Sequence, residues 1–158
     1  MAIRQIRKDG DPELRKKAAE VIRFTQPLHR LIEDMIDTMK EAQGVGLAAP
    51  QVGISKRVIV IQDNDTVFEI VNPEIIANQG EVIDIEGCLS CPGAYGEVSR
   101  YAEVEVKGKD RHGKDIQVTG QALLARVLQH EIDHLDGVLF IDKAIRLLDP
   151  EELKKISE

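Results

Sequence analysis

One short segment, residues 130–134 with the sequence His-Glu-Ile-Asp-His, sets the strongest limit on how this chain folds. On a helix, residues four apart face the same side, so His130 and His134 can each give one imidazole nitrogen to a divalent metal ion. The Glu131 carboxylate between them can take a proton from metal-bound water and return it to a leaving group. The segment therefore predicts a helix with a catalytic metal site, but it does not identify a substrate.

Apolar residues continue the same side of this predicted helix. Steps of three or four residues lead back from the two histidines to Val127 and Leu123, so both imidazoles lie on an apolar stripe and are expected to point inward. Two imidazoles in one core are costly unless a ligand binds both. Thr119 is the expected N-cap of the helix, and Gly137 is expected to end it.

The third metal ligand has to come from another part of the chain, because catalytic centres of this type usually have three protein ligands and one open position. The residues after His134 lack the histidine and glycine spacing of the metzincin proteases. Upstream, the chain's two cysteines, Cys88 and Cys91, share a turn-rich segment that follows an expected strand. A zincin-type protease with a different third ligand stays open as the enzymatic alternative.

Three segments stand in a recognisable order along the chain: Gly44–Gln51 (GVGLAAPQ), Glu86–Ser90 (EGCLS) and Gln129–Gly137 (QHEIDHLDG). Together they resemble the signature motifs of the peptide deformylases, and the likeness extends over nearly the whole chain. The resemblance implies a metal-dependent hydrolase that removes the formyl group from the N-terminal formylmethionine of newly made polypeptides and releases formate. It also implies one catalytic domain over residues 1–158.

The resemblance assigns the metal ligands and the acid that moves the proton. Cys88, His130 and His134 are the expected ligands, and metal-bound water is the expected nucleophile. Glu131 is the expected general base during attack and the general acid for the departing amine. The family points to Fe²⁺ in the cell, while purified protein can contain Zn²⁺, Ni²⁺ or Co²⁺, because imidazole and thiolate ligands suit all of these ions.

Other site residues are also assigned by resemblance. The Gln51 side-chain amide and the Leu89 backbone N–H are the expected donors to the oxyanion. Glu86 and Arg100 are expected to form an ion pair that holds the cysteine loop. Four residues are expected to contact the substrate: Val45, Gly46, Leu123 and Val127. Each of the apolar side chains among them is also compatible with ordinary core packing.

Cys91 introduces an alternative to the enzyme hypothesis, because the family more often has an aliphatic or aromatic residue at this position. Cys88 and Cys91 together with the two histidines could form a closed four-ligand zinc site without activity. This binding-module hypothesis leaves Glu131 and Gln51 without a role, and the cysteine pair lies farther from the histidine pair than in zinc fingers. A redox C-x-x-C motif is a weaker alternative, and a small core residue is the favoured interpretation.

Composition and patterning predict an α+β fold with mainly antiparallel sheets packed around a central metal-binding helix. The chain has 158 residues, 42% hydrophobic and 31% charged, which suits a single soluble domain. An amphipathic helix is predicted around residues 28–39, and a helix start at Asp11-Pro12. Two hairpins are predicted from strand pairs at 57–62 with 66–71, and 101–107 with 115–119.

The net charge of −7 and a pI near 5.2 argue against nucleic-acid binding through a basic surface. The expected partners are therefore N-formylmethionyl nascent peptides, and any ribosome contact is expected to be local. No targeting segment or membrane span is recognisable, so a cytoplasmic location without membrane association is expected. A monomer is the expected state, although the sequence does not determine it.

Overall fold

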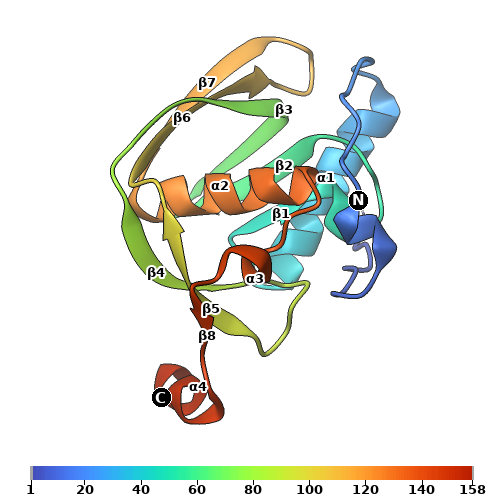
Figure 1. Cartoon of the computed structure of the whole chain (residues 1–158). Coiled ribbons are helices and arrows are strands. Elements are labelled where there is room, and N and C mark those ends of the chain that lie inside the picture. Colours follow the sequence, from blue (N-terminus) through green and yellow to red (C-terminus); the bar gives the residue numbers. More distant parts are fainter. Residues whose placement is uncertain (1, 158) are drawn as a thin grey trace.

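The chain folds as two antiparallel sheets with helices packed on them, and the computed structural model describes residues 2–157 (Figure 1). The helical elements are η1 (Pro12–Arg15), α1 (Gln26–Glu41), η2 (Ala49–Val52), α2 (Ala122–Leu135), α3 (Phe140–Lys143) and α4 (Pro150–Ser157). The strands are β1 (Gly46–Ala48), β2 (Val58–Asp63), β3 (Thr66–Gln79), β4 (Val82–Gly87), β5 (Tyr95–Arg100), β6 (Glu103–Lys109), β7 (Asp115–Gln121) and β8 (Arg146–Leu147).

Strand order divides the molecule into a larger and a smaller sheet. The larger sheet has the order β1-β2-β3-β6-β7, and the smaller one has the order β4-β5-β8. Every pairing between these strands is antiparallel. Helix α2 crosses the middle of the molecule between the two sheets (Figure 1). The predicted α+β class with mainly antiparallel sheets is therefore confirmed.

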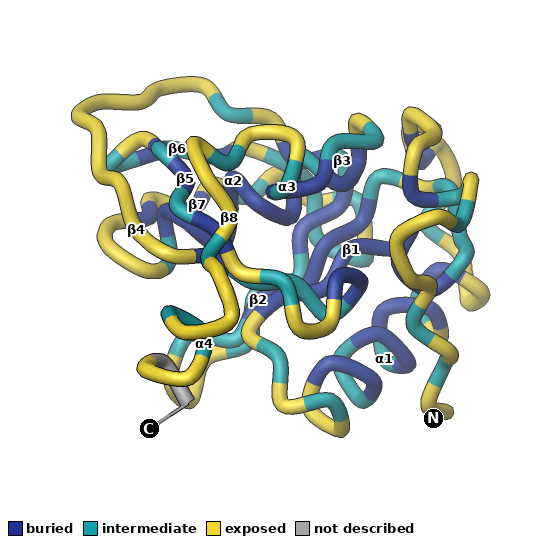
Figure 2. The backbone as a smooth tube through the Cα atoms, turned by 60° about the horizontal axis from the view of Figure 1, so that its bottom comes forward, coloured by how far each residue is buried: buried dark blue, intermediate teal, exposed yellow. Residues whose placement is uncertain are grey.

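Both faces of the larger sheet are covered at β2, which explains the uninterrupted apolar sequence of this strand. Side chains alternate along a strand, so Ile59 and Ile61 pack with α2 in one hydrophobic cluster. Val58 and Val60 point to the opposite face and pack with α1 in a second cluster. Figure 2 shows the buried backbone of β1 and β2 in the interior of the molecule. This single strand thus contributes to both cores.

The predicted amphipathic helix and both predicted hairpins are present. In α1 the buried residues recur at helical spacing, and its apolar members are Leu28, Leu31, Ile32, Met35 and Met39. The first hairpin joins β2 to β3 through a tight turn in which Asn64 has a φ of 54°. The second joins β6 to β7, with Lys109 paired to Asp115. Asp11 caps the short helix η1 by accepting a hydrogen bond from the Glu13 N–H.

The predicted start of the metal helix was wrong by two residues. Thr119 does not cap it, because β7 continues through Gln121 and Thr119 pairs with Glu105 inside the sheet. The strand passes directly into α2 at Ala122, whose φ of 53° makes the sharp change of direction. The predicted end is correct, since Gly137 follows the C-cap residue with a φ of 75°.

No helix in the part of the chain that the structure describes is long and apolar enough to cross a membrane.

Candidate metal centre

A thiol and two imidazoles meet where the start of the β4–β5 loop lies against α2. The possible ligand atoms of Cys88, His130 and His134 all lie within 4.8 Å of one another. The Cys88 Sγ is 3.4 Å from the His134 Nε2. Both imidazoles point inward as expected, with only 8% and 1% of their residue surfaces exposed. The structure thus brings together the three expected metal ligands from two distant segments of the chain.

The chemistry of these donors fits a divalent transition-metal ion. One sulfur and two imidazole nitrogens form a set that suits Zn²⁺, Fe²⁺, Ni²⁺ or Co²⁺ and leaves a coordination position open. Burial lowers the pKa of His134 well below its usual value, which keeps this imidazole neutral and able to coordinate a cation. Cys91 is not a member of the group. The geometry therefore supports three ligands and speaks against the closed four-ligand site.

Glu86 fixes the orientation of one of the imidazoles. Its Oε1 lies 2.9 Å from the His130 Nδ1, which leaves the Nε2 of that ring for the metal centre. Arg100 donates to both Glu86 oxygens at 2.8 and 2.9 Å. Burial raises the pKa of Glu86, but the hydrogen bonds from Arg100 and His130 outweigh it and hold that pKa far below its usual value. Glu86 is thus a buried carboxylate anion in contact with the expected metal ligand His130.

Arg126 is a second cation on Glu86, and the sequence motifs did not predict it. Its Nη1 donates to the Glu86 Oε2 at 2.6 Å and to the Val98 carbonyl at 2.9 Å, and its Nη2 donates to the Val82 carbonyl at 2.7 Å. Arg126 therefore ties α2 to both β4 and β5. A signal was present in the sequence, because Arg126 precedes His130 by four residues and thus shares its helix face.

Glu131 lies beside the donors without a hydrogen-bond partner for its Oε1 among the described residues. Burial raises the pKa of Glu131 to about 7, which suits a group that accepts and returns a proton near neutral pH. The position of its other oxygen, Oε2, explains why residue 46 is a glycine. A Cβ there would lie 2.5 Å from the Glu131 Oε2 and 2.8 Å from the Val127 Cγ1. A side chain at position 46 would displace this carboxylate.

The Gln51 side chain is held in place beside the Cys88 sulfur. Its Oε1 accepts from the Ala48 N–H at 3.0 Å, and its Nε2 donates to the Ser90 Oγ at 3.1 Å. The same nitrogen lies 3.6 Å from the Cys88 Sγ, which is a long contact. The Leu89 N–H takes part in no hydrogen bond among residues 2–157. These two groups are therefore donors close to the expected ligands.

A cavity of about 330 Å³ opens above the donors. Its lining includes the expected oxyanion donors and substrate contacts, namely Gln51, Leu89, Val45, Gly46, Leu123 and Val127. Leu123 differs from the other residues of the apolar stripe, because it does not face inward. It is 61% exposed in the first turn of α2, at the rim of the cavity, whereas Val127 one turn later is buried.

The two cysteines form a tight turn, and their thiols interact. A hydrogen bond with Cys91 and burial raise the pKa of the Cys88 thiol, while the same hydrogen bond lowers the pKa of Cys91. A divalent cation at the centre would favour the Cys88 thiolate instead. Cys91 is buried in an apolar cluster with Leu14, Val98 and Phe140. This packing agrees with the interpretation of Cys91 as a small core residue.

Known proteins resemble this chain over nearly its whole length. A sequence model of a family described as polypeptide deformylase matches residues 3–149. The peptide deformylase of Acetivibrio thermocellus is 53% identical over 158 residues, which is 100% of this chain and 93% of that protein. The matched region contains every residue of the candidate metal centre.

Solved structures have the same fold. A crystal structure of a peptide deformylase from Legionella pneumophila aligns with a TM-score of 0.87 at 48% identity, covering 98% of this chain and 95% of that one. A second, from Thermotoga maritima, aligns with a TM-score of 0.89 at 42% identity, covering 91% of this chain and 99% of that one. The similarity therefore includes the arrangement of both sheets as well as the sequence motifs.

Proposed function

The chain belongs to the peptide deformylase family, and on that premise we propose how its own residues remove the formyl group from the N-terminal formylmethionine of new polypeptides. The reaction is a hydrolysis that releases formate and a free α-amino group. One observation supports the proposal most strongly, namely the meeting of a thiol and two imidazoles beside a buried, unpartnered carboxylate. This combination provides both a metal site and a proton carrier.

Cys88, His130 and His134 are the proposed ligands of the metal ion. A divalent cation held there supplies Lewis-acid polarisation of a carbonyl oxygen and lowers the pKa of water. The Glu86 carboxylate keeps His130 oriented by accepting from its Nδ1, and Arg100 and Arg126 hold Glu86 in turn. Positioning groups of this kind are often worth about 10 to 100-fold in metal affinity or activity.

Glu131 is the proposed proton carrier. Its carboxylate accepts a proton as water attacks the formyl carbon, and it then gives this proton to the departing amine nitrogen. The absence of a hydrogen-bond partner for its Oε1 in the described structure supports this role, because the oxygen is free to bind the proton. A pKa of about 7, raised by burial, matches both the accepting and the donating step at neutral pH.

Gln51 and Leu89 are the proposed donors to the oxyanion that develops on the formyl oxygen. The hydrogen bond from Ala48 to the Gln51 Oε1 turns the amide nitrogen toward the centre. The Leu89 N–H has no partner among the described residues, so it can donate to a ligand. Donors that are held in place before the reaction stabilise the oxyanion without a reorganisation cost.

The methionine side chain is proposed to lie in the cavity against Val45, Leu123 and Val127. Val45 and Leu123 are 48% and 61% exposed, so burying them against a substrate would remove apolar surface from water. Gly46 is proposed to let the peptide backbone lie against β1, in addition to the room that it leaves for Glu131.

The remaining proposals concern the wider setting of the reaction. Fe²⁺ is the proposed ion in the cell, with Zn²⁺, Ni²⁺ or Co²⁺ in purified protein, because the donor set suits all four. The protein is proposed to act in the cytoplasm as a monomer with one catalytic domain over residues 1–158. Nascent N-formylmethionyl peptides are its substrates, and any contact with the ribosome is local, in keeping with the net charge of −7.

The test compares two reactions of one purified protein. Formyl-methionyl peptides should release formate, while internal bonds of longer peptides should remain intact. Glu131→Gln should lower formate release by about 100 to 10,000-fold and keep the metal content, because it removes only the proton carrier. Asp136→Asn is the matched control, since Asp136 is a half-exposed acid at the end of the same helix that pairs with Arg57.

Two results would contradict the proposal. Internal cleavage that outpaces formate release would favour the zincin-type protease instead. Equal losses of metal and activity in Glu131→Gln would mean that this residue supports the metal centre and does not carry the proton.

A further inference from the structure

Cys88 and Cys91 occupy the ends of one tight turn after β4. The Cys91 N–H donates to the Cys88 carbonyl at 3.0 Å, which is the hydrogen bond of a four-residue β-turn. Such a turn holds its end Cα atoms within about 7 Å, close to the separation of about 4.4 to 6.8 Å that a disulfide needs. The backbone of this turn therefore already places the two cysteines within the range that a disulfide can bridge.

A segment from the other end of the chain holds this turn in place. The Asp9 N–H donates to the Ser90 carbonyl at 2.8 Å, and the Lys8 Nζ donates to the Leu89 carbonyl at 3.1 Å. Both central residues of the turn are thus fixed from outside, so the cysteines at its ends stay close to each other.

The two thiols differ in how a reagent can reach them. Cys88 is half-buried and lines the cavity of about 330 Å³, so a small oxidant that enters the cavity meets it. Cys91 is only 7% exposed and packs with Val98 and Phe140. The metal centre does not use it. Cys88 is therefore the sulfur that is oxidised first, and Cys91 is a second, more deeply buried thiol.

We propose that Cys88 and Cys91 form an oxidative modification site for small hydroperoxides. The Cys88 sulfur attacks one oxygen of the hydroperoxide, the O–O bond breaks, and water or an alcohol leaves. Cys88 becomes a sulfenic acid. Cys91 sulfur then attacks Cys88 sulfur, a second water leaves, and a disulfide forms. In total, two thiols and one hydroperoxide give one disulfide, one alcohol or water, and one further water. The thiols lose two electrons and two protons, and the O–O bond is reduced.

This disulfide would have a consequence for the metal centre, and that consequence rests on the proposed function. A sulfur bound in a disulfide is no longer a thiolate ligand, so the ion would be released and formate release would stop. A thiol reductant would restore both. Without Cys91, the sulfenic acid would instead be oxidised to sulfinic and sulfonic acids, which such reductants do not reverse.

The experiment treats Zn²⁺-loaded, full-length protein with hydrogen peroxide and follows it in three ways. Intact mass and peptide mapping detect the disulfide, a chromogenic chelator detects released Zn²⁺, and a formate assay detects activity. The wild type should lose the mass of two hydrogens, release its Zn²⁺ and regain activity with dithiothreitol. Cys91→Ala should gain oxygen atoms on Cys88 and regain little activity. Cys91→Ser is a second variant with the same expectation.

The proposal is overturned if oxidised wild type gains oxygen on Cys88 while Cys91 remains a free thiol. It is also overturned if the wild type and both variants recover equally. The mass measurement on the wild type needs neither a variant nor an active enzyme. If the reduced protein released no formate, the proposed function would fail, while the mass measurement would still decide whether the disulfide forms.

Discussion

At the scale of single residues, the candidate metal centre depends on the absence of a side chain at position 46 as well as on the side chains that form it. Gly46 has no Cβ, and the Glu131 carboxylate occupies the adjacent space. The resemblance to the family predicts that this glycine contacts the substrate. The structure shows that the Glu131 carboxylate also needs this space, a contact that spacing along the chain could not reveal because the two positions are 85 residues apart.

Gly46→Ala should therefore lower formate release with little loss of bound metal. The added methyl group would displace the Glu131 Oε2, and a displacement of about 1 Å at a reacting group can cost about 100-fold in rate. Steady-state kinetics with metal analysis would check this. Gly10→Ala is the control, because its methyl group would lie in open space and Gly10 does not line the cavity. Equal losses in the two variants would contradict the explanation.

Arg126→Met should weaken metal binding, because it removes one of the two guanidinium groups on buried Glu86. Glu86 would then orient His130 less well, and we expect a loss of about 10 to 100-fold in metal affinity. Competition with a chromogenic chelator measures this, and Co²⁺ absorption reports the ligand geometry. Arg126→Lys should recover part of the loss. Arg111→Met, at an ion-pair cluster with Glu33 and Glu69, should leave the affinity unchanged.

At the scale of elements, helices were easier to predict than the ends of strands. The apolar residues of α1 recur at helical spacing, so its position followed from the sequence. Thr119 looked like an N-cap because capping is a local signal, but its pairing with Glu105 across the sheet is non-local and prevailed. The short strand β8 gave no sequence signal, since it consists of Arg146 and Leu147 alone.

The end of α2 offers a test of element boundaries. Gly137→Ala should destabilise the fold, because a Cβ there would lie 2.5 Å from the Arg15 carbonyl oxygen and φ is 75°. Gly93→Ala is matched in backbone, with a φ of 79°, but has open space around it. The left-handed backbone should cost both variants about 1 to 2 kcal/mol. The clash should cost Gly137→Ala about 1 to 3 kcal/mol more. Urea unfolding would measure the difference, and equal losses would contradict it.

The attachment of the N-terminal segment to α1 should depend on pH. Buried Asp34 accepts from the Ala2 N–H and pairs with Arg4. Burial raises the pKa of Asp34, but these two contacts outweigh it and lower that pKa below its usual value. The carboxylate therefore stabilises the folded state above the unfolded pKa of about 3.9, and this contribution is lost as the pH falls through the lowered value.

Asp34→Asn should thus reduce the free energy of unfolding at pH 7 by about 1 to 3 kcal/mol. The difference from the wild type should shrink as the pH approaches about 3. Urea unfolding at several pH values measures it. Asp37→Asn on the same helix is the control. A difference that stays constant with pH would show that the Asp34 charge is not responsible.

At the scale of the whole molecule, the sequence predicted the class of fold but not the arrangement of its parts. The three donors were identified from motifs, yet their meeting depends on β4 lying against α2. Arg126 contributes to that contact through the Val82 carbonyl of β4, and it also donates to the Val98 carbonyl of β5. No local pattern in the sequence indicates which strand lies next to which helix, because such contacts join distant segments. Strand order in the smaller sheet was unpredictable for the same reason.

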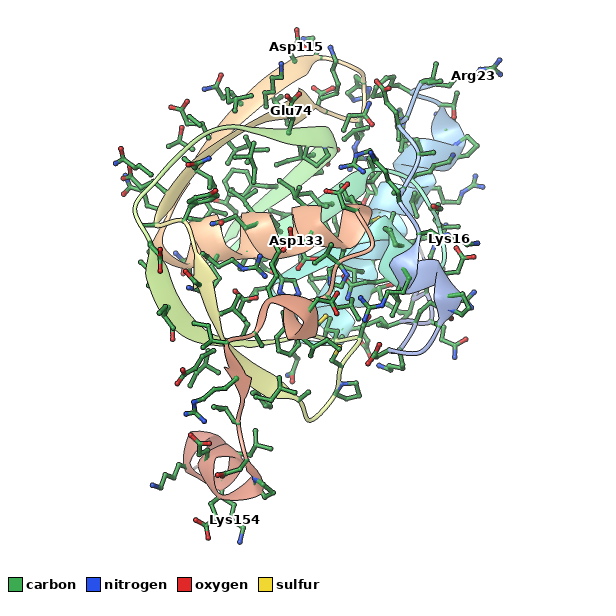
Figure 3. All side chains as sticks on the ribbon, viewed as in Figure 1. Lys16, Arg23, Glu74, Asp115, Asp133 and Lys154 are labelled. Carbon is green, nitrogen blue, oxygen red and sulfur yellow. The ribbon has the colours of Figure 1, made fainter. Side chains whose placement is uncertain are left out.

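Helix α4 lies apart from the body of the molecule (Figure 1), and Lys154 on it is far from Asp133 on α2 (Figure 3). Its described residues contribute nothing to the three hydrophobic clusters. Removing residues 149–158 should therefore change the melting temperature and the deformylation of short peptides very little. Phe140→Ala, at the buried residue of helix α3, should by contrast cost about 3 to 5 kcal/mol. A truncated protein as unstable as Phe140→Ala would contradict this.

Strand β2 has a consequence for how the molecule denatures. Successive residues of β2 belong to different hydrophobic clusters. If either cluster opened, one face of this strand would therefore be exposed to solvent. Melting should therefore be cooperative, with α1 and α2 lost together, and the amide protons of β2 should be the slowest to exchange with solvent.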